Sequence, residues 1–202
     1  MPLILNVIPP QGFEITRDRI GEILADEISS QVAKSYNTDI DAAVYVERSN
    51  QIDKTELPLI NISLSTGSYD NKNQGHVNGT YTFDIDAYTH AKSTEDESGD
   101  VLAAMKLQRI LGVCRAILEN PIYKTLGYEA GFILRTGFSD INIAIPGAGK
   151  LDTLNTLMGR LSFTVVLVES TELIVPQLIA GYDTSLKLEL TDNGYKYVGN
   201  AA

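Results

Sequence analysis

The segment from Ala42 to Asn120 restricts the fold more than any other part of this sequence, because it joins three alternating strands to one long amphipathic helix. Apolar and polar residues alternate over Ala42–Arg48, Pro58–Ser65 and Thr80–Tyr88, which is typical of strands with one buried face. In the third strand, aromatic and aliphatic residues occupy one face, and Thr and Asp residues occupy the other. We expect this sheet to be covered on one side, with its polar face meeting water or a partner.

Two segments have the periodicity of amphipathic helices. Apolar residues recur at three- and four-residue spacing over about Thr16–Ser35, and Thr16 is the expected cap. In the second segment a broad apolar stripe ends at Asn120, because the next residue is proline. Thr94 and Glu97 have capping-box spacing, so we expect the second helix to begin there.

Two more strands and a hairpin are expected in the rest of the chain. The strand candidates are Gly131–Ile145, with a bend near Ser139, and Leu157–Glu169. Beyond Thr171, alternating leucines precede an Asn-Gly pair, which is a hairpin signal. The expected organisation is therefore a domain over residues 1–170 and an extension over residues 171–202. Because a lone hairpin is marginally stable, it must pack on the core, a neighbouring subunit or another protein.

Composition excludes several classes of protein. The 202 residues carry a formal net charge of −10, which argues against a nucleic-acid surface because such surfaces concentrate Lys and Arg. The single cysteine, Cys114, rules out an internal disulfide and lies on the apolar stripe of a predicted helix, so we expect it to be buried. No apolar run is long enough for a membrane span, and Met1–Pro10 lacks the basic residues of a signal peptide.

The sequence offers no convincing catalytic, cofactor or metal site. Pro146–Lys150 resembles the end of a phosphate-binding loop, but the first glycine and the hydroxyl residue of that motif are missing. Asp84 and Asp86 share a strand face without the spacing of a metal-binding loop, so a solvated sheet face explains them. His76 and His90 are too far apart in sequence to suggest a metal pair. We therefore expect a protein that is not an enzyme and has no cofactor.

The order of elements resembles that of the tail terminator (tail completion) proteins of tailed bacteriophages. The resemblance covers roughly residues 14–169, and the extension after Thr171 has no counterpart in the basic family pattern. After the first helix, the segments that carry it are Ala43–Arg48, Glu56–Ile62, Tyr81–Tyr88, Asp100–Leu118 and Arg160–Val165.

This resemblance implies an α+β subunit with two main helices on one face of a mixed, largely antiparallel sheet. It also implies a hexameric ring that caps the tail tube protein, stops tube growth and meets the head-completion or neck proteins, and the sheath if the tail contracts. DNA would pass through the lumen without specific binding, since acidic walls repel it. The family has no catalytic residues. The implied location is the neck of the virion, after assembly in the host bacterial cytoplasm and away from membranes.

Two regions are the candidate protein interfaces. The loop Thr66–Gly79 is rich in Gly, Asn, Ser and Asp, so we expect it to be exposed and mobile, and within the resemblance it would act as an arm toward the tube or a neighbour. The hairpin of the extension would add strands to an open sheet edge of a neighbour or the sheath. The candidate contact residues are Tyr69, Asn71, Lys72, Asn73 and His76 in the loop, and Tyr195 and Tyr197 in the hairpin.

Two other functions stay open. One is a different neck or tail component, either a head–tail joining protein or a tube subunit, which would share ring symmetry. The other is a small-ligand or sugar-binding module, for which tyrosines would supply flat amphipathic contacts. The tyrosines concerned are Tyr81, Tyr88, Tyr182, Tyr195 and Tyr197.

Overall fold

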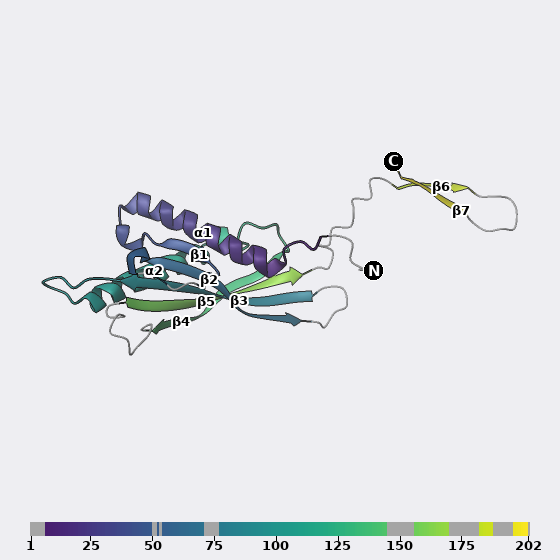
Figure 1. The fold of residues 1–202 in the computed structure, drawn as a ribbon. Coiled ribbons are helices and arrows are strands. Elements are labelled where there is room, and N and C mark those ends of the chain that lie inside the picture. The colour runs from purple at the N-terminus through teal and green to yellow at the C-terminus, as the bar shows by residue number, and fades with distance from the viewer. Residues whose placement is uncertain are drawn as a thin grey trace. The chain divides into compact units, whose positions relative to one another are not determined.

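The computed structural model describes residues 7–49, 52, 54–70, 77–144, 156–169, 182–187 and 196–201. Contacts divide the chain into two compact units, Pro10–Ser170 and a unit that combines Met1–Pro9 with Thr171–Ala202. In chain order the described elements of the larger unit (Figure 1) are α1 (Gly12–Ser35), η1 (Thr38–Ile40), β1 (Ala43–Val46), η2 (Lys54–Glu56), β2 (Leu59–Asp70), β3 (Val77–His90), α2 (Gly99–Leu118), η3 (Pro121–Tyr123), β4 (Ile133–Ala144) and β5 (Thr156–Glu169).

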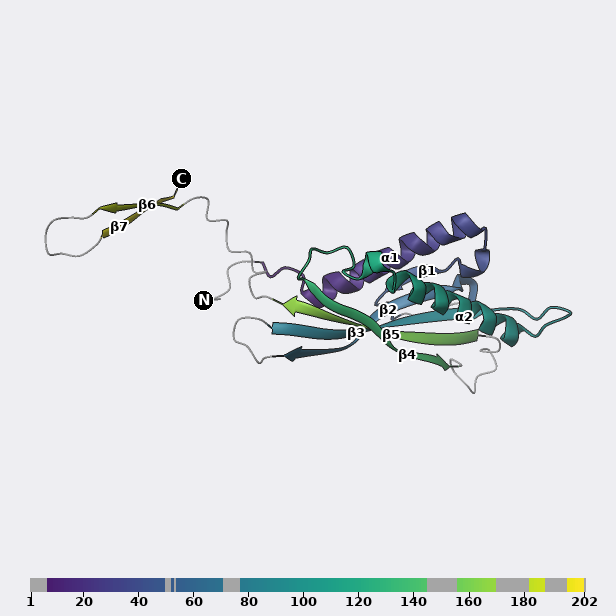
Figure 2. The same cartoon turned by 180° about the vertical axis from the view of Figure 1, so that it is seen from behind.

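The larger unit is a sheet with both α-helices on one face (Figures 1 and 2). The strand order is β1-β2-β3-β5-β4, so β1 and β4 are the two edges. β1 runs parallel to β2, whereas β2, β3, β5 and β4 pair antiparallel with their neighbours. The predicted α+β class, with a mixed and largely antiparallel sheet under two helices, is confirmed.

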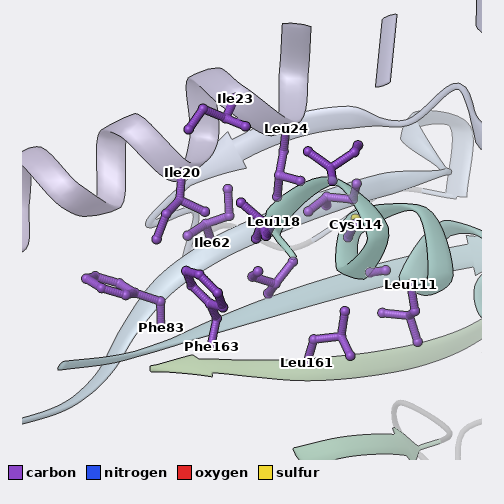
Figure 3. Packing of buried hydrophobic residues seen from close by; sticks show 14 of the residues in the cluster. Ile20, Ile23, Leu24, Ile62, Phe83, Leu111, Cys114, Leu118, Leu161 and Phe163 are labelled. Carbon is purple, nitrogen blue, oxygen red and sulfur yellow. The ribbon is translucent and has the colours of Figure 1, made fainter. Parts of the chain in front are cut away.

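The core fills the space between the helices and the sheet. Each helix buries one stripe of residues, and β5 buries every second residue, as the two periodicities require. β2 and β3 also bury consecutive residues, over Leu59–Ile62 and Phe83–Ala87. Cys114 is fully buried, and burial raises the pKa of its thiol to about 12. Figure 3 labels core residues from α1 (Ile20, Ile23, Leu24), from α2 (Leu111, Cys114, Leu118) and from the sheet (Ile62, Phe83, Leu161, Phe163).

The start predicted for the first helix is wrong. α1 begins at Gly12, because the backbone N–H of Gln11 donates to the Glu14 carboxylate at 2.6 Å in a capping box. Thr16 therefore lies inside the helix rather than at its cap. It is buried, and its hydroxyl has no hydrogen-bond partner among the described residues.

The start predicted for the second helix is also wrong, by a few residues. The backbone N–H of Glu97 donates to Thr94 Oγ1 at 3.1 Å, and that of Thr94 donates to the Glu97 carbonyl at 2.9 Å. These bonds close a turn before the helix. α2 begins at Gly99 with Ser98 at its cap, and it ends at Leu118, close to the predicted proline stop.

Several strands are longer than their sequence patterns. β2 continues to Asp70 and β3 begins at Val77, so the predicted exposed loop over Thr66–Gly79 is wrong at both ends. β4 is one strand in which the pairing register shifts between Phe138 and Asp140, where the sequence suggested a bend. Such a shift is a bulge, which bends a strand without ending it.

The second unit contains a two-stranded antiparallel sheet. β6 (Tyr182–Lys187) pairs with β7 (Lys196–Ala201), with Tyr182 opposite Ala201. The Asn-Gly turn predicted between the strands lies outside the described residues. Across the part of the chain that the structure describes, no helix is both long and apolar enough to cross a lipid bilayer.

Candidate interaction surfaces

The distal halves of β2 and β3 form a paired arm, defined here as Thr66–Asp70 with Asn78–Thr82. Every residue of its β2 half is exposed. Tyr69 of the predicted contact set lies on this arm and is 54% exposed. Asn71, Lys72, Asn73 and His76, the other predicted contacts of this loop, lie outside the described residues.

Two glycines and the Tyr81 ring explain why the strands continue into this arm. Gly67 is the register partner of Tyr81, and Gly79 precedes it by two residues on the same strand. A Cβ atom at Gly67 would lie 2.8 Å from the ring, and one at Gly79 would lie 2.4 Å from it. The ring thus occupies the space that side chains would take. An aromatic ring over strand glycines replaces their missing packing.

Tyr81 also connects the arm to the rest of the larger unit. Its hydroxyl donates to Glu169 Oε1 at 2.5 Å, and its ring lies 5.5 Å from that of Phe13. The Tyr69 ring meets it edge-on at 5.9 Å. Burial, followed by the hydrogen bonds with Glu169 and Tyr69, raises the pKa of Tyr81 above its ordinary value. Tyr69 is therefore an exposed aromatic side chain packed against the buried Tyr81 ring, as is typical of protein-contact residues.

The open face of the sheet holds an ion network rather than solvated carboxylates. Asp84 and Asp86 are only 6% and 4% exposed, so the prediction of a solvated sheet face is wrong for them. Arg160, the register partner of Asp86, donates to both its carboxylate oxygens at 2.7 Å and approaches Asp84 at 2.9 Å. Ser162 donates to Asp84 at 3.0 Å. The hydrogen bond to Asp86 raises the pKa of Arg160 above its ordinary value.

This network limits what the open face can do chemically. The guanidinium already occupies both carboxylates, so neither is free as a general base or a cation ligand. Within the described residues no group of three or more His, Cys, Asp or Glu side chains could hold a metal ion. His90 lies half-buried at the end of β3. The face is therefore a candidate contact surface.

The edge strand β4 carries the apolar surface of the sheet. The segment Asp140–Ala144, called here the edge segment, is exposed at every residue. Its two isoleucines, Ile141 and Ile143, are 60% and 52% exposed. They alternate along the sequence, but the sequence could not show that they lie on an edge, because strand order depends on distant pairing.

A groove lies between α1 and α2. It encloses about 340 Å³ over a floor that includes Ile40, Val113 and Ile117. Its carboxylate, Glu27, accepts a hydrogen bond from the Tyr123 hydroxyl at 2.6 Å. Arg109 is the other charged group of the lining, and the uncharged polar groups are Gln31, Ser35, Asn120 and Tyr123.

The tyrosines that a sugar-binding module would use belong to two separate units of the chain. Tyr81 is a buried residue of the arm, and Tyr88 is partly buried, which raises its pKa. Tyr182 and Tyr197 belong to β6 and β7, and Tyr195 lies outside the described residues.

No protein-family model matches the chain. No curated protein matches it either. Function is therefore inferred from the arm, the ion network and the edge segment.

Proposed function

We propose that this chain is a structural protein of tailed bacteriophages, a tail terminator that forms a ring on the tail tube, stops its growth and offers a surface to the neck proteins. The observation that carries the proposal is the fold: a mixed five-stranded sheet with both helices on one face. Its elements follow one another in the order that resembles the terminator family.

The two sheet edges support a ring. A closed ring requires two different patches on each subunit, arranged so that the rotation between neighbours closes. β1 and β4 lie at opposite ends of the strand order, and they differ in length and in chemistry. β1 has four residues, and its Tyr45 ring lies 4.6 Å from the guanidinium of Arg48, two residues beyond the strand. β4 has twelve residues and exposes isoleucines. We expect six copies in the ring.

The arm supports contact with the tube. The exposed Tyr69 ring is held by its contact with the buried Tyr81 ring, so its side chain loses little conformational freedom on binding. The net charge of −10 supports a lumen that DNA crosses without binding. In this role the protein works in the virion neck and needs no cofactor, and its partners are the tube protein, the head-completion proteins and, in a contractile tail, the sheath.

Two alternatives give different behaviour. A tube subunit, or a head–tail joining protein, would share the small mixed fold and ring symmetry, but a tube subunit would assemble into open-ended tubes. The groove between α1 and α2 is the observation that favours a small-ligand module, which would not bind tail tubes.

Light scattering over a wide concentration range, with negative-stain imaging of the same sample, tests the assembly. A closed ring, or a monomer that joins a ring only on tube ends, supports the proposal. Tyr69→Ala should weaken tube binding at least tenfold, whereas Met105→Ala, at a 60% exposed site on α2, should not. Open-ended tubes would make the chain a tube subunit, and a monomer indifferent to tubes would return the ligand module to first place.

A further inference from the structure

We propose that the edge segment of one copy is the docking site for the β6–β7 hairpin of a second copy. The inference rests on the proposed function only in expecting several copies to meet in one assembly. It assigns a specific self-association contact to the hairpin and to the edge segment, which the proposed ring uses only as part of an exposed edge.

The edge segment has a free hydrogen-bonding side. β4 pairs with β5 alone in the described sheet, so its other side offers unpaired N–H and C=O groups. The register with β5 is unbroken from Asp140 to Ala144, beyond the bulge. Natural edge strands are commonly protected by bulges, prolines or lysines, and this segment has none of them. Such an edge accepts an added strand readily.

The exposed isoleucines determine which side an added strand would bury. Ile141 is the register partner of buried Leu161, so it points to the helix-covered face. Ile143 is the register partner of Gly159, where a Cβ atom would lie 2.6 Å from Leu111 of α2. Both isoleucines therefore lie at the margin of the core. A strand with apolar residues on that side would extend the core by one strand.

The hairpin fits this site in length. A two-stranded hairpin alone is marginally stable, so it gains most by joining a larger sheet. β6 and β7 each have six residues, against five in the edge segment. Twelve residues separate Glu169 from Tyr182. Fully extended they span about 40 Å, comparable with the diameter of a domain of this size, which is enough to reach a neighbour.

Charge favours the same pairing. Lys187 and Lys196 are register partners in the hairpin, and like charges at opposite positions destabilise a sheet pair. The hairpin strands carry these two lysines and one acid, Asp183. Asp140 is the one charged residue of the edge segment, and no ion pair of Asp140 is found among the described residues. A basic hairpin beside an acidic edge relieves the lysine repulsion.

Disulfide trapping tests the contact between copies. Cys114 is fully buried with a raised pKa, so it does not compete. We would purify Ile141→Cys with a size tag and, separately, Thr184→Cys and Ser185→Cys, which cover both faces of β6. The variants would be mixed at micromolar concentration and oxidised. The expected result is a mixed disulfide at least ten times more abundant than with Met105→Cys as the tagged partner.

Three results would overturn the proposal. Mixed disulfides no more abundant than in the Met105→Cys control would show that the hairpin does not meet the edge. A dominant Ile141→Cys homodimer would show that β4 pairs with β4. A double variant, Ile141→Cys with Ser185→Cys, that closes only within one chain would place the hairpin on its own subunit. Unchanged urea midpoints for the reduced variants ensure that each comparison uses folded protein.

Tube capping by the same reduced variants separates this inference from the proposed function. Mixed disulfides without capping would leave the docking contact in place and refute the terminator role. Capping without mixed disulfides would do the reverse. Ile141→Lys should in addition weaken self-association at least tenfold, whereas Met105→Lys should leave it unchanged.

Discussion

Gly79→Ala should destabilise the protein, because the new Cβ atom would overlap the Tyr81 ring. The atom would lie 2.4 Å from Cε2 and 2.8 Å from both Cζ and the hydroxyl oxygen. The ring cannot swing away, since it is 2% exposed, packs on Phe13 and donates to Glu169. Overpacking of this kind costs about 1–3 kcal/mol, and the lost chain entropy of glycine offsets about 0.5–1 kcal/mol.

The expected net loss is therefore about 1–2 kcal/mol in the free energy of unfolding, or roughly 2–8 °C in Tm for a chain of this size. Urea unfolding of a double-mutant cycle with Tyr81→Leu measures it. In the Tyr81→Leu background, Gly79→Ala should be neutral or stabilising, because the clash has gone. Gly137→Ala on β4 is the matched control, since no atom lies within 4 Å of its Cβ position. Equal costs of Gly79→Ala in both backgrounds would refute the reasoning.

The other predictions concern the ion network, α2 and the alkaline limit. Arg160→Gln should lower the free energy of unfolding by about 2 kcal/mol, because it leaves two buried carboxylates without their cation, and the partial exposure of Arg160 keeps the loss from being larger. Exposed Arg109→Gln is the control. Equal urea midpoints for the two variants would contradict this expectation. Gly112→Ala should stabilise the protein by about 0.5–1 kcal/mol, because the new Cβ atom meets no atom within 4 Å and α2 gains helix propensity. A lower urea midpoint than that of the unchanged protein would count against this expectation. Burial raises the pKa of the Cys114 thiol to about 12. The thiol therefore contributes its full stability below the pKa of the unfolded chain, and this contribution is lost as pH rises from about 9 to 12. Cys114→Ala should flatten the fall in the free energy of unfolding over that range, and curves of this free energy against pH that run parallel for the two proteins would contradict the assignment.

The central sheet and helices were predictable because one face of each element is buried. The apolar residues that alternate along β3 from Tyr81 to Ala87 are all buried, as the pattern predicts. The stripe that includes Cys114 likewise predicts the packed face of α2. These patterns survive in the sequence because burial repeats every second residue in a strand and at three- to four-residue spacing in a helix.

The rest depended on contacts between distant residues. Asp84 and Asp86 look solvated until Arg160, which follows them by more than seventy residues, pairs beside them. The polar run after Ser65 looks like a loop because its packing partner is the Tyr81 ring. Alternating Asp residues on one strand and Arg160 with Ser162 on another were the available signals, but only strand order joins them.

The interface assignments divide in a similar way. Tyr69, chosen from composition of the loop, is exposed on the arm, but its contact with the buried Tyr81 ring could not be read from the sequence. Ile141 and Ile143 had a visible alternation, and their edge position comes from the topology alone.

The most direct test of the terminator role is the length of tail tubes grown from their purified tube protein, with this chain added at increasing concentration and imaged by negative stain. We predict tubes that stop growing, each with a ring of extra density at one end, and full-length growth with Tyr69→Ala. Tubes that grow to the same length with and without the protein would contradict the account.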